Sequence, residues 1–281
     1  MPRICLITGA NSGIGRITAL ELAKQGFHII MLCRNLDKAR PVREEIKRVA
    51  NGGTVDLLRC DLADLTSVAQ AAREVIDRYD RLDVLVNNAG LFLDREQYSP
   101  QGVELTFATN HLGPFLLTTR LLDLLRRGDN ARVVTVSSEA HRITGFGGFR
   151  LDELAKPKSY GGWTAYGASK LCNILFANEL SNRLLDDGIT SNSLHPGGVN
   201  TNFGSDVASV TGVLFRLMKP FFISPEQGAE TSIFLAASPE VEHVTGLYFS
   251  KKRPITPNND ARSDYNAKRL WQLSDELTQT Y

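Results

Sequence analysis

Short apolar runs alternate with amphipathic stretches along almost the whole chain. The early runs are apolar without interruption, which is typical of parallel strands covered on both faces. The expected strands are Arg3–Thr8, His28–Leu32, Val55–Cys60, Val84–Asn87, Arg132–Ser137, Thr190–His195 and Gly246–Phe249. The stretches with helical periodicity are Gly13–Gln25, Asp37–Ala50, Thr66–Tyr79, Gly102–Arg126, Ala165–Asp186 and Pro225–Ala237.

This alternation of strands and helices predicts an α/β fold with a doubly wound parallel sheet. The chain has 281 residues, a length at which such folds often form one domain. Two irregular stretches, Thr144–Gly162 and Val199–Phe222, each follow a predicted strand. Ligands bind outside the carboxyl ends of the strands in such sheets, so we expect both stretches to form walls of a substrate pocket.

The composition is that of an ordinary globular protein, with 42% hydrophobic and 22% charged residues. The net charge is +1 and the charges are interspersed, so there is no electrostatic argument for binding nucleic acid. The first strand starts almost at Met1, which leaves no room for a signal peptide, and no run of 18 apolar residues predicts a transmembrane span.

The cysteines and histidines give no sign of a disulfide framework or a metal centre. Four scattered cysteines, without a C-x-x-C pair, indicate reduced and mostly buried thiols, and we predict a cytoplasmic location. None of the five histidines has the spacing of metal ligands, so we predict no metal.

A glycine-rich turn connects the first strand to the first helix. Gly9, Gly13 and Gly15 have the spacing G-x-x-x-G-x-G, which differs from the general G-x-G-x-x-G fingerprint. Glycines let the backbone approach a pyrophosphate closely, and the helix N-terminus offers N–H donors to it. A plain strand-to-helix turn is the competing interpretation, but the flanking strand and helix favour a dinucleotide site.

Arg34 ends the second strand, 19 residues beyond Gly15. An acidic residue at such a position would bind the ribose hydroxyls of NAD, whereas an arginine favours the additional phosphate of NADP. Lys38 adds positive charge nearby. Asp37 is the acidic rival, and we interpret it as a helix cap. We therefore predict NADP as the cofactor.

Two further strand ends carry candidate cofactor contacts. Asp61 closes the third strand where an adenine edge can be bound, although helix capping explains this residue almost as well. The fourth strand ends in Asn87-Asn88-Ala89-Gly90, whose small residues permit close approach of the backbone and whose amides can connect neighbouring loops.

The candidate catalytic pair is Tyr166 and Lys170. They stand four residues apart in a predicted helix, so their side chains share a face. A free tyrosine titrates near pH ~10, and an adjacent ammonium is expected to lower that pKa. Tyr248 and Lys252 repeat the spacing, but they lie in a strand that runs into a loop, so we interpret that pair as a coincidence.

Two polar residues complete the candidate set. Ser138 lies 28 residues before Tyr166 at the end of a strand, where a hydroxyl can bind a substrate oxygen. The spacing alone does not choose between Ser138 and Ser137. Asn110 lies in an otherwise apolar helix, where it is either a core amide or the holder of a water that connects Lys170 to solvent.

These residues together resemble the short-chain dehydrogenase/reductase superfamily. The resemblance covers nearly the whole chain and rests on T-G-A-N-S-G-I-G at 8–15, C-D-L at 60–62, N-N-A-G at 87–90, Asn110, S-S at 137–138, Y-G-A-S-K at 166–170 and H-P-G at 195–197. It implies a single Rossmann-type domain over residues 1–281, with a sheet of about seven parallel strands and helices on both faces. It also implies a catalytic set of Asn110, Ser138, Tyr166 and Lys170.

The resemblance also assigns the dinucleotide site. Lys170 would bind the nicotinamide ribose, and Pro196–Thr201 would flank the nicotinamide and the diphosphate. Together with the turn and strand ends above, the expected cofactor-binding residues are Gly9, Asn11, Ser12, Gly13, Ile14, Gly15, Arg34, Lys38, Asp61, Leu62, Asn88, Ala89, Gly90, Tyr166, Lys170, Pro196, Gly197, Val199 and Thr201.

Within the superfamily, the chain is similar to the retinol dehydrogenase group. The similarity rests on Cys33-Arg34-Asn35, on residues 110–118, on Ser137-Ser138-Glu139-Ala140-His141 and on Leu270-Trp271-Gln272-Leu273-Ser274. That group prefers NADP(H) and accepts lipophilic carbonyls and alcohols. The sequence departs from its eukaryotic members in lacking their anchoring N-terminal segment and in the loop after Gly197.

We therefore predict an NADP(H)-dependent oxidoreductase that interconverts a lipophilic or broadly accepted carbonyl and its alcohol. The segment 199–223 is the expected substrate loop, and its apolar part, 207–222, is a lid, a core surface or a peripheral membrane contact. The family often forms homodimers through its central helices, here Gly102–Arg126 and Ala165–Asp186. A dinucleotide-binding sensor or scaffold without turnover is the alternative.

Overall fold

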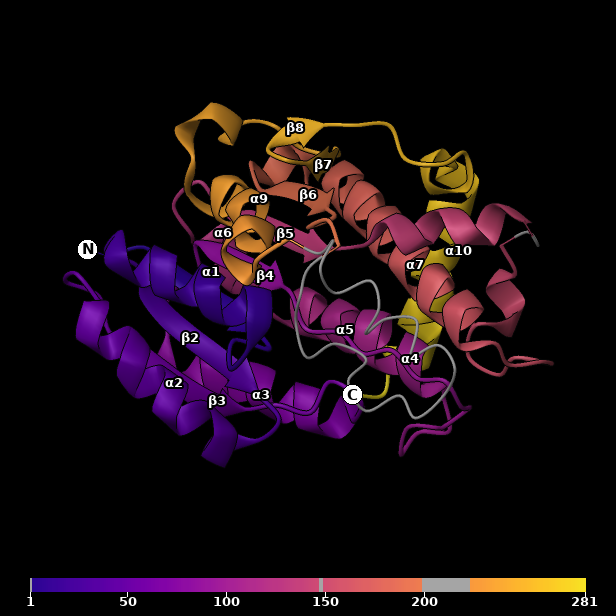
Figure 1. Cartoon of the computed structure of the whole chain (residues 1–281), viewed down its shortest axis with the longest axis horizontal. Helices are drawn as coiled ribbons and strands as arrows, with labels where there is room; N and C mark the ends of the chain where they lie inside the picture. Colours follow the sequence, from indigo (N-terminus) through magenta and orange to yellow (C-terminus); the bar gives the residue numbers. More distant parts are fainter. Residues whose placement is uncertain (1, 147–148, 199–222) are drawn as a thin grey trace.

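A central sheet with the strand order β3-β2-β1-β4-β5-β6-β7-β8 organises the molecule (Figure 1). The structure is a computed structural model that describes residues 2–146, 149–198 and 223–281. All neighbouring strands pair in parallel except β7 and β8. The strands are β1 (Ile4–Thr8), β2 (His28–Cys33), β3 (Val55–Arg59), β4 (Val84–Asn87), β5 (Arg132–Val136), β6 (Thr190–Leu194), β7 (Tyr248–Ser250) and β8 (Arg253–Pro254).

Helices cover both faces of this sheet. The principal ones are α1 (Gly13–Lys24), α2 (Leu36–Val49), α3 (Leu65–Arg78), α4 (Leu105–Phe107), α5 (Gly113–Arg120), α6 (Leu122–Arg126), α7 (Gly162–Arg183), α9 (Pro225–Ala237) and α10 (Asp264–Thr278). Side-chain caps start several of them. Asp64 accepts from the Thr66 amide before α3, and Ser224 forms a capping box with Gln227 before α9.

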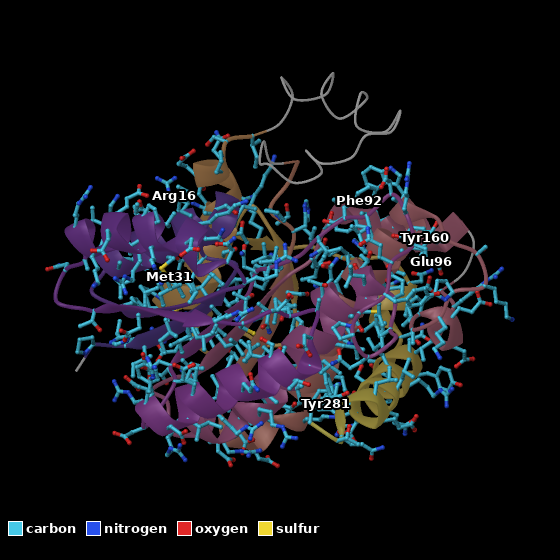
Figure 2. All side chains as sticks on the ribbon, turned by 90° about the horizontal axis from the view of Figure 1, so that it is seen from below. Arg16, Met31, Phe92, Glu96, Tyr160 and Tyr281 are labelled. Carbon is cyan, nitrogen blue, oxygen red and sulfur yellow. The ribbon has the colours of Figure 1, made fainter. Side chains whose placement is uncertain are left out.

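Strand side chains alternate between two cores. In β1, Cys5 and Ile7 point to a core shared with α1, α2 and α9, whereas Leu6 points to a core shared with α3, α5, α7 and α10. Met31 of β2 belongs to the first core and is fully buried (Figure 2). Because both faces are covered, β1, β2 and β4 carry mainly apolar residues, whereas β6 is buried although its sequence is Thr-Ser-Asn-Ser-Leu.

The prediction of one continuous helix over Gly102–Arg126 is wrong. Glu104 forms a β-bridge with Tyr98, and its carboxylate then caps α4 by accepting from the Thr106 and Phe107 amides. A π-helical segment, Ala108–Leu112, separates α4 from α5, and the Gly113 amide donates to the Ala108 carbonyl. Pro114 follows and cannot donate to the Asn110 carbonyl one turn earlier, so the regular series of α-helical hydrogen bonds is interrupted here.

Two elements were missing from the sequence prediction. Strand β8 pairs antiparallel with β7 across a two-residue turn of Lys251 and Lys252, whose φ angles are 49° and 62°. Such turns normally carry asparagine or glycine, so the two lysines gave no signal. Helix α10 is amphipathic and capped by Ser263, which accepts from the Asn266 amide. Its sequence did contain a helix signal that the prediction overlooked.

The architecture confirms the predicted α/β, Rossmann-type class, with helices on both sides of a mostly parallel sheet. The expected substrate loop at 199–223 lies outside the described residues except for Ile223. In the described part of the chain, every helix is too short or too polar to cross a bilayer.

Candidate active site

The glycine turn between β1 and α1 is built by close packing of backbone on backbone. Gly9 and Gly13 have φ angles of +68° and +52°, a region that favours glycine. A Cβ on Gly15 would lie 2.5 Å from the Gly9 carbonyl oxygen, so only hydrogen fits there. The Ser12 side chain does not cap α1, which leaves first-turn amides available to a phosphate.

Strand β4 is tied to this turn through Thr8. The Thr8 hydroxyl accepts from the amides of Asn88 and Ala89, both at 3.0 Å, and the Asn88 side-chain amide donates to the Thr8 carbonyl at 2.8 Å. A Cβ on Gly9 would lie 3.0 Å from the Ala89 Cβ. Hydrogen bonds therefore hold the ends of β1 and β4 together beside the glycine turn.

Arg34 and Lys38 are exposed at the end of β2 and the start of α2. Arg34 has no ion pair with a described residue. The interpretation of Asp37 as the helix cap is wrong, because Asn35 accepts from the Lys38 amide at 3.0 Å and occupies the cap position. Asp37 instead pairs with Arg40 at 3.5 Å on the solvent side of α2.

Asp61 closes a short side-chain-to-backbone turn after β3, whereas the cap of α3 is Asp64. The Asp61 Oδ1 accepts from the Ala63 amide at 3.1 Å, and the Asp61 amide donates to the Ser67 hydroxyl at 3.0 Å. Leu62 is buried against α5, where a Cβ on Gly113 would overlap the Leu62 carbonyl oxygen. The loop that would border an adenine is thus fixed by its own hydrogen bonds.

Ser138 and Tyr166 lie together, at the end of β5 and in the first turns of α7. The Ser138 hydroxyl is hydrogen-bonded to the Tyr166 phenol. The Ser137 hydroxyl instead donates to the Lys170 carbonyl of the same helix at 2.6 Å. Spacing could not distinguish the two serines, and the structure places the hydroxyl of Ser138, which the resemblance implied, at the Tyr166 phenol.

Lys170 is buried one helical turn from Tyr166. Its Nζ donates to the Val136 carbonyl at 3.1 Å and lies 5.6 Å from the centre of the Tyr166 ring. A Cβ on Gly90 would lie 3.2 Å from this Nζ and 3.3 Å from the Asn110 Oδ1, so the fourth strand's end approaches both side chains. The structure thereby brings Lys170, Tyr166, Ser138 and Asn110 to one edge of the sheet.

Asn110 lies in the π-helical segment and is almost completely buried. Its Nδ2 donates to the Leu91 carbonyl and to the Ser169 hydroxyl, both at 2.9 Å, and its Oδ1 accepts from the Leu91 amide at 2.7 Å. Both side-chain N–H groups and one lone pair of Oδ1 are therefore used in joining the β4 loop to α7. The Asn110 main-chain carbonyl cannot accept from residue 114, because Pro114 has no N–H.

Burial shifts both central pKa values. It raises the pKa of Tyr166 to about 12, and the hydrogen bond with Ser138 offsets part of this rise. It lowers the pKa of Lys170 to about 8. The sequence predicted that Lys170 would lower the Tyr166 pKa. In the structure burial raises that pKa instead, and the hydrogen bond with Ser138 is what offsets part of the rise, so the phenol is protonated at neutral pH.

Two aromatic residues beside Tyr166 were missed by the sequence prediction. Phe92 and Trp163 approach the Tyr166 ring edge-on, with centroid distances of 5.8 and 6.4 Å. Phe92 lies in the same region as Tyr160, whose hydroxyl donates to the Leu93 carbonyl at 3.0 Å (Figure 2). Trp163 precedes Tyr166 by three residues on α7, a helical spacing that could have revealed it.

The end of β6 carries the remaining predicted contacts. Gly197 has a φ of +91°, and its amide donates to the His195 Nδ1 at 3.2 Å. The His195 Nε2 lies 3.0 Å from Glu139, the residue after Ser138. Pro196 and Gly197 thus lie close to the catalytic strand end. The predicted contacts Val199 and Thr201 and the proposed lid at 207–222 lie outside the described residues.

The second Tyr-x-x-x-Lys pair is separated, as the sequence interpretation expected. Tyr248 is buried in β7, whereas Lys252 lies in the turn before β8 and pairs with Glu230 at 2.9 Å. Residues four apart on an extended chain cannot share a ligand in the way helical neighbours do.

Comparison with known proteins identifies the family. Residues 3–149 match the short chain dehydrogenase family. Retinol dehydrogenase 14 of Homo sapiens is 40% identical, over 97% of this chain and 85% of that protein. A crystal structure from Mycobacterium paratuberculosis has a TM-score of 0.77 and 32% identity, covering 99% of this chain and 93% of that one. A short chain dehydrogenase of Shigella flexneri complexed with NADP has a TM-score of 0.68 and 26% identity, covering 89% and 97%.

The chain therefore belongs to the short-chain dehydrogenase/reductase family and resembles the retinol dehydrogenases. It is an oxidoreductase of that family, and its fold is that of a nicotinamide dinucleotide-binding protein. The crowded glycine turn and the uncapped first turn of α1 fit such a dinucleotide.

Proposed function

We propose that the protein is an NADP(H)-dependent oxidoreductase that interconverts a carbonyl and an alcohol. The observation that carries this proposal is the buried cluster of Tyr166, Lys170 and Ser138 beside a turn built for a dinucleotide. A protein that only binds a dinucleotide has no need to bury an ammonium beside a phenol, because burying a charge destabilises the fold.

Tyr166 is the proposed proton donor in the direction of reduction. The dinucleotide, when bound, supplies or accepts the hydride. Because burial keeps the pKa of Tyr166 near 12, the phenol holds its proton until the substrate oxygen gains charge. The Ser138 hydroxyl is positioned at the same phenol and would donate to that oxygen.

Lys170 would stabilise the phenolate that remains after the proton has moved. Its pKa of about 8 leaves most of the side chain protonated at neutral pH. We propose that protons reach Lys170 from solvent through a water held at Asn110, next to the Gly90 backbone. Asn110 itself would act mainly by fixing the position of that site through Leu91 and Ser169.

The preference for NADP rests on charge. Arg34 and Lys38 are exposed at the end of β2, and Arg34 has no carboxylate partner among the described residues. A free guanidinium can bind a ribose phosphate through paired hydrogen bonds. The NADP complex of the Shigella flexneri relative is consistent with this preference.

A lipophilic carbonyl is the proposed substrate class. Phe92 and Trp163 present apolar rings around Tyr166, and the retinol dehydrogenases are the named relatives. An apolar wall at the reacting oxygen would favour substrates that bury hydrocarbon. Peripheral membrane contact and a cytoplasmic location remain part of this proposal.

The test is a cofactor-oxidation assay with NADPH and a series of aldehydes and ketones of increasing chain length. We expect turnover that rises with substrate hydrophobicity and falls by about 10³-fold or more in Tyr166→Phe. The Tyr160→Phe variant, which changes a phenol bonded to Leu93, serves as the matched control and should retain activity. Tight NADPH binding without turnover of any substrate would favour the alternative, a dinucleotide-binding sensor or scaffold.

A further inference from the structure

His141 lies three residues after Ser138, in the 3-10-helical segment Glu139–Phe146, and its side chain is completely buried. Its Nδ1 is 2.8 Å from the Ser138 carbonyl oxygen. Its Nε2 is 3.3 Å from the main-chain amide of Asn258, in the segment between β8 and α10. The ring therefore bridges the end of the catalytic strand to a segment more than 100 residues away.

The partners determine which nitrogen carries the proton. The Ser138 carbonyl can only accept, so the His141 Nδ1 must donate to it. The Asn258 amide can only donate, so Nε2 must accept. The ring is thus a neutral Nδ1–H tautomer, and burial lowers the pKa of His141, which keeps it neutral.

Further bonds join the same two segments. The His141 carbonyl accepts from the Asn258 side-chain amide at 3.3 Å. Arg142 donates to the Thr256 carbonyl at 3.0 Å. The main chain after Ser138 is consequently tied to the segment 256–258.

We propose that His141 is a positioning residue for the reaction, because its Nδ1–H bond fixes the Ser138 main chain and thereby the Ser138 hydroxyl at Tyr166. The proposal rests on the proposed function, in which that hydroxyl binds the substrate oxygen. A displacement of about 1 Å at a catalytic group can lower a rate by about 10²-fold. The bond to Ser138 should therefore matter more for turnover than the bond to Asn258.

Two substitutions separate these bonds. His141→Asn can place its Nδ2 where the ring has Nδ1, which keeps the donor to Ser138 and loses the acceptor for Asn258. His141→Gln can place its Oε1 where the ring has Nε2, which does the reverse. We expect kcat within about threefold of wild type for H141N and about tenfold or more below it for H141Q. The KM for NADPH should change by less than about twofold in both.

Urea unfolding of both variants provides the comparison with a purely structural role. If kcat falls equally in the two variants, or follows their unfolding free energies, the proposal is overturned. The ¹H–¹⁵N spectrum of the wild-type histidines is a second test that needs no variant: an Nε2–H tautomer or a charged His141 ring at pH 7 also overturns it.

The variant Ser138→Ala distinguishes this inference from the proposed function. If S138A retains wild-type turnover, the role of Ser138 fails and the proposed function must be revised. If S138A loses turnover while H141Q retains it, only the positioning role of His141 is refuted.

Discussion

The Lys170 ammonium lies 5.6 Å from the centre of the Tyr166 ring, and burial shifts the pKa values of the two groups in opposite directions. Tyr166 is held neutral while Lys170 is forced to carry a charge inside the protein. A buried ammonium disfavours folding, which fits the proposed role of the pair in proton transfer and not a role in stability.

The first prediction is that Lys170→Met stabilises the fold while it abolishes turnover. The pKa of Lys170 falls from 10.5 to about 8 on folding, so the folded state binds the proton more weakly than the unfolded state. The penalty is full below pH 8 and disappears as pH rises toward 10.5. We expect a gain in unfolding free energy of about 3 kcal/mol at pH 7.

Chemical unfolding between pH 6 and about pH 10.5 measures this effect. The Val136 carbonyl, which loses Lys170, still accepts from the Asn173 side chain at 3.0 Å, so no buried acceptor is left unpaired. Lys268→Met, on the exposed face of α10, is the matched control and should show no such pH-dependent gain. A K170M variant less stable than wild type at pH 7 would contradict the argument.

The second prediction concerns the glycine turn. In Gly15→Ala the new methyl would lie 2.5 Å from the Gly9 carbonyl oxygen, so the turn must shift. We expect a loss of about 2 kcal/mol in unfolding free energy and a loss of about tenfold or more in dinucleotide affinity. Fluorescence titration with NADPH measures the affinity. Gly161→Ala is the control, because its new methyl would lie no closer than 3.4 Å to a neighbour.

The third prediction tests the cofactor preference. Arg34→Asp replaces an exposed cation by an anion at the end of β2. The affinity for NADP(H) should fall by about tenfold to 100-fold, because a charge-assisted hydrogen-bond pair is replaced by repulsion, whereas the affinity for NAD(H) should change little. Arg48→Asp, near the other end of α2, makes the same change in net charge and should affect neither cofactor. Equal losses for both cofactors in R34D would refute the assignment.

The sequence was sufficient for features that depend on local patterns. The seven parallel strands, the glycine turn and the placement of Tyr166 and Lys170 on one helix all follow from apolar periodicity and fixed spacing. Spacing alone did not choose between Ser138 and Ser137, and the family resemblance implied Ser138; in the structure both hydroxyls bond to α7, Ser138 to the Tyr166 phenol and Ser137 to the Lys170 carbonyl. The π-helical segment around Asn110 likewise reflects tertiary packing.

Other features depend on contacts between distant segments, which periodicity does not encode. The direction of the Tyr166 pKa shift is set by complete burial, and the sequence showed only the nearby Lys170. His141 meets Asn258 only because β8 and the following segment fold back over the end of β5. The role of α10 was missed for a different reason. Its amphipathic pattern can be recognised in the sequence, but the helices on which it packs cannot.

The last prediction concerns α10 and the expected homodimer. Trp271 of α10 stacks on Phe176 of α7 at 6.0 Å and meets Phe115 of α5 edge-on at 4.9 Å, so α10 occupies the face of the helices expected to pair. We expect light scattering to give a monomer unless α10 is displaced. Trp271→Ala should lower the unfolding free energy by about 2–3 kcal/mol and promote self-association, while Tyr265→Ala, 72% exposed on the same helix, should do neither. A wild-type dimer that W271A leaves unchanged would show that the subunits pair through another face.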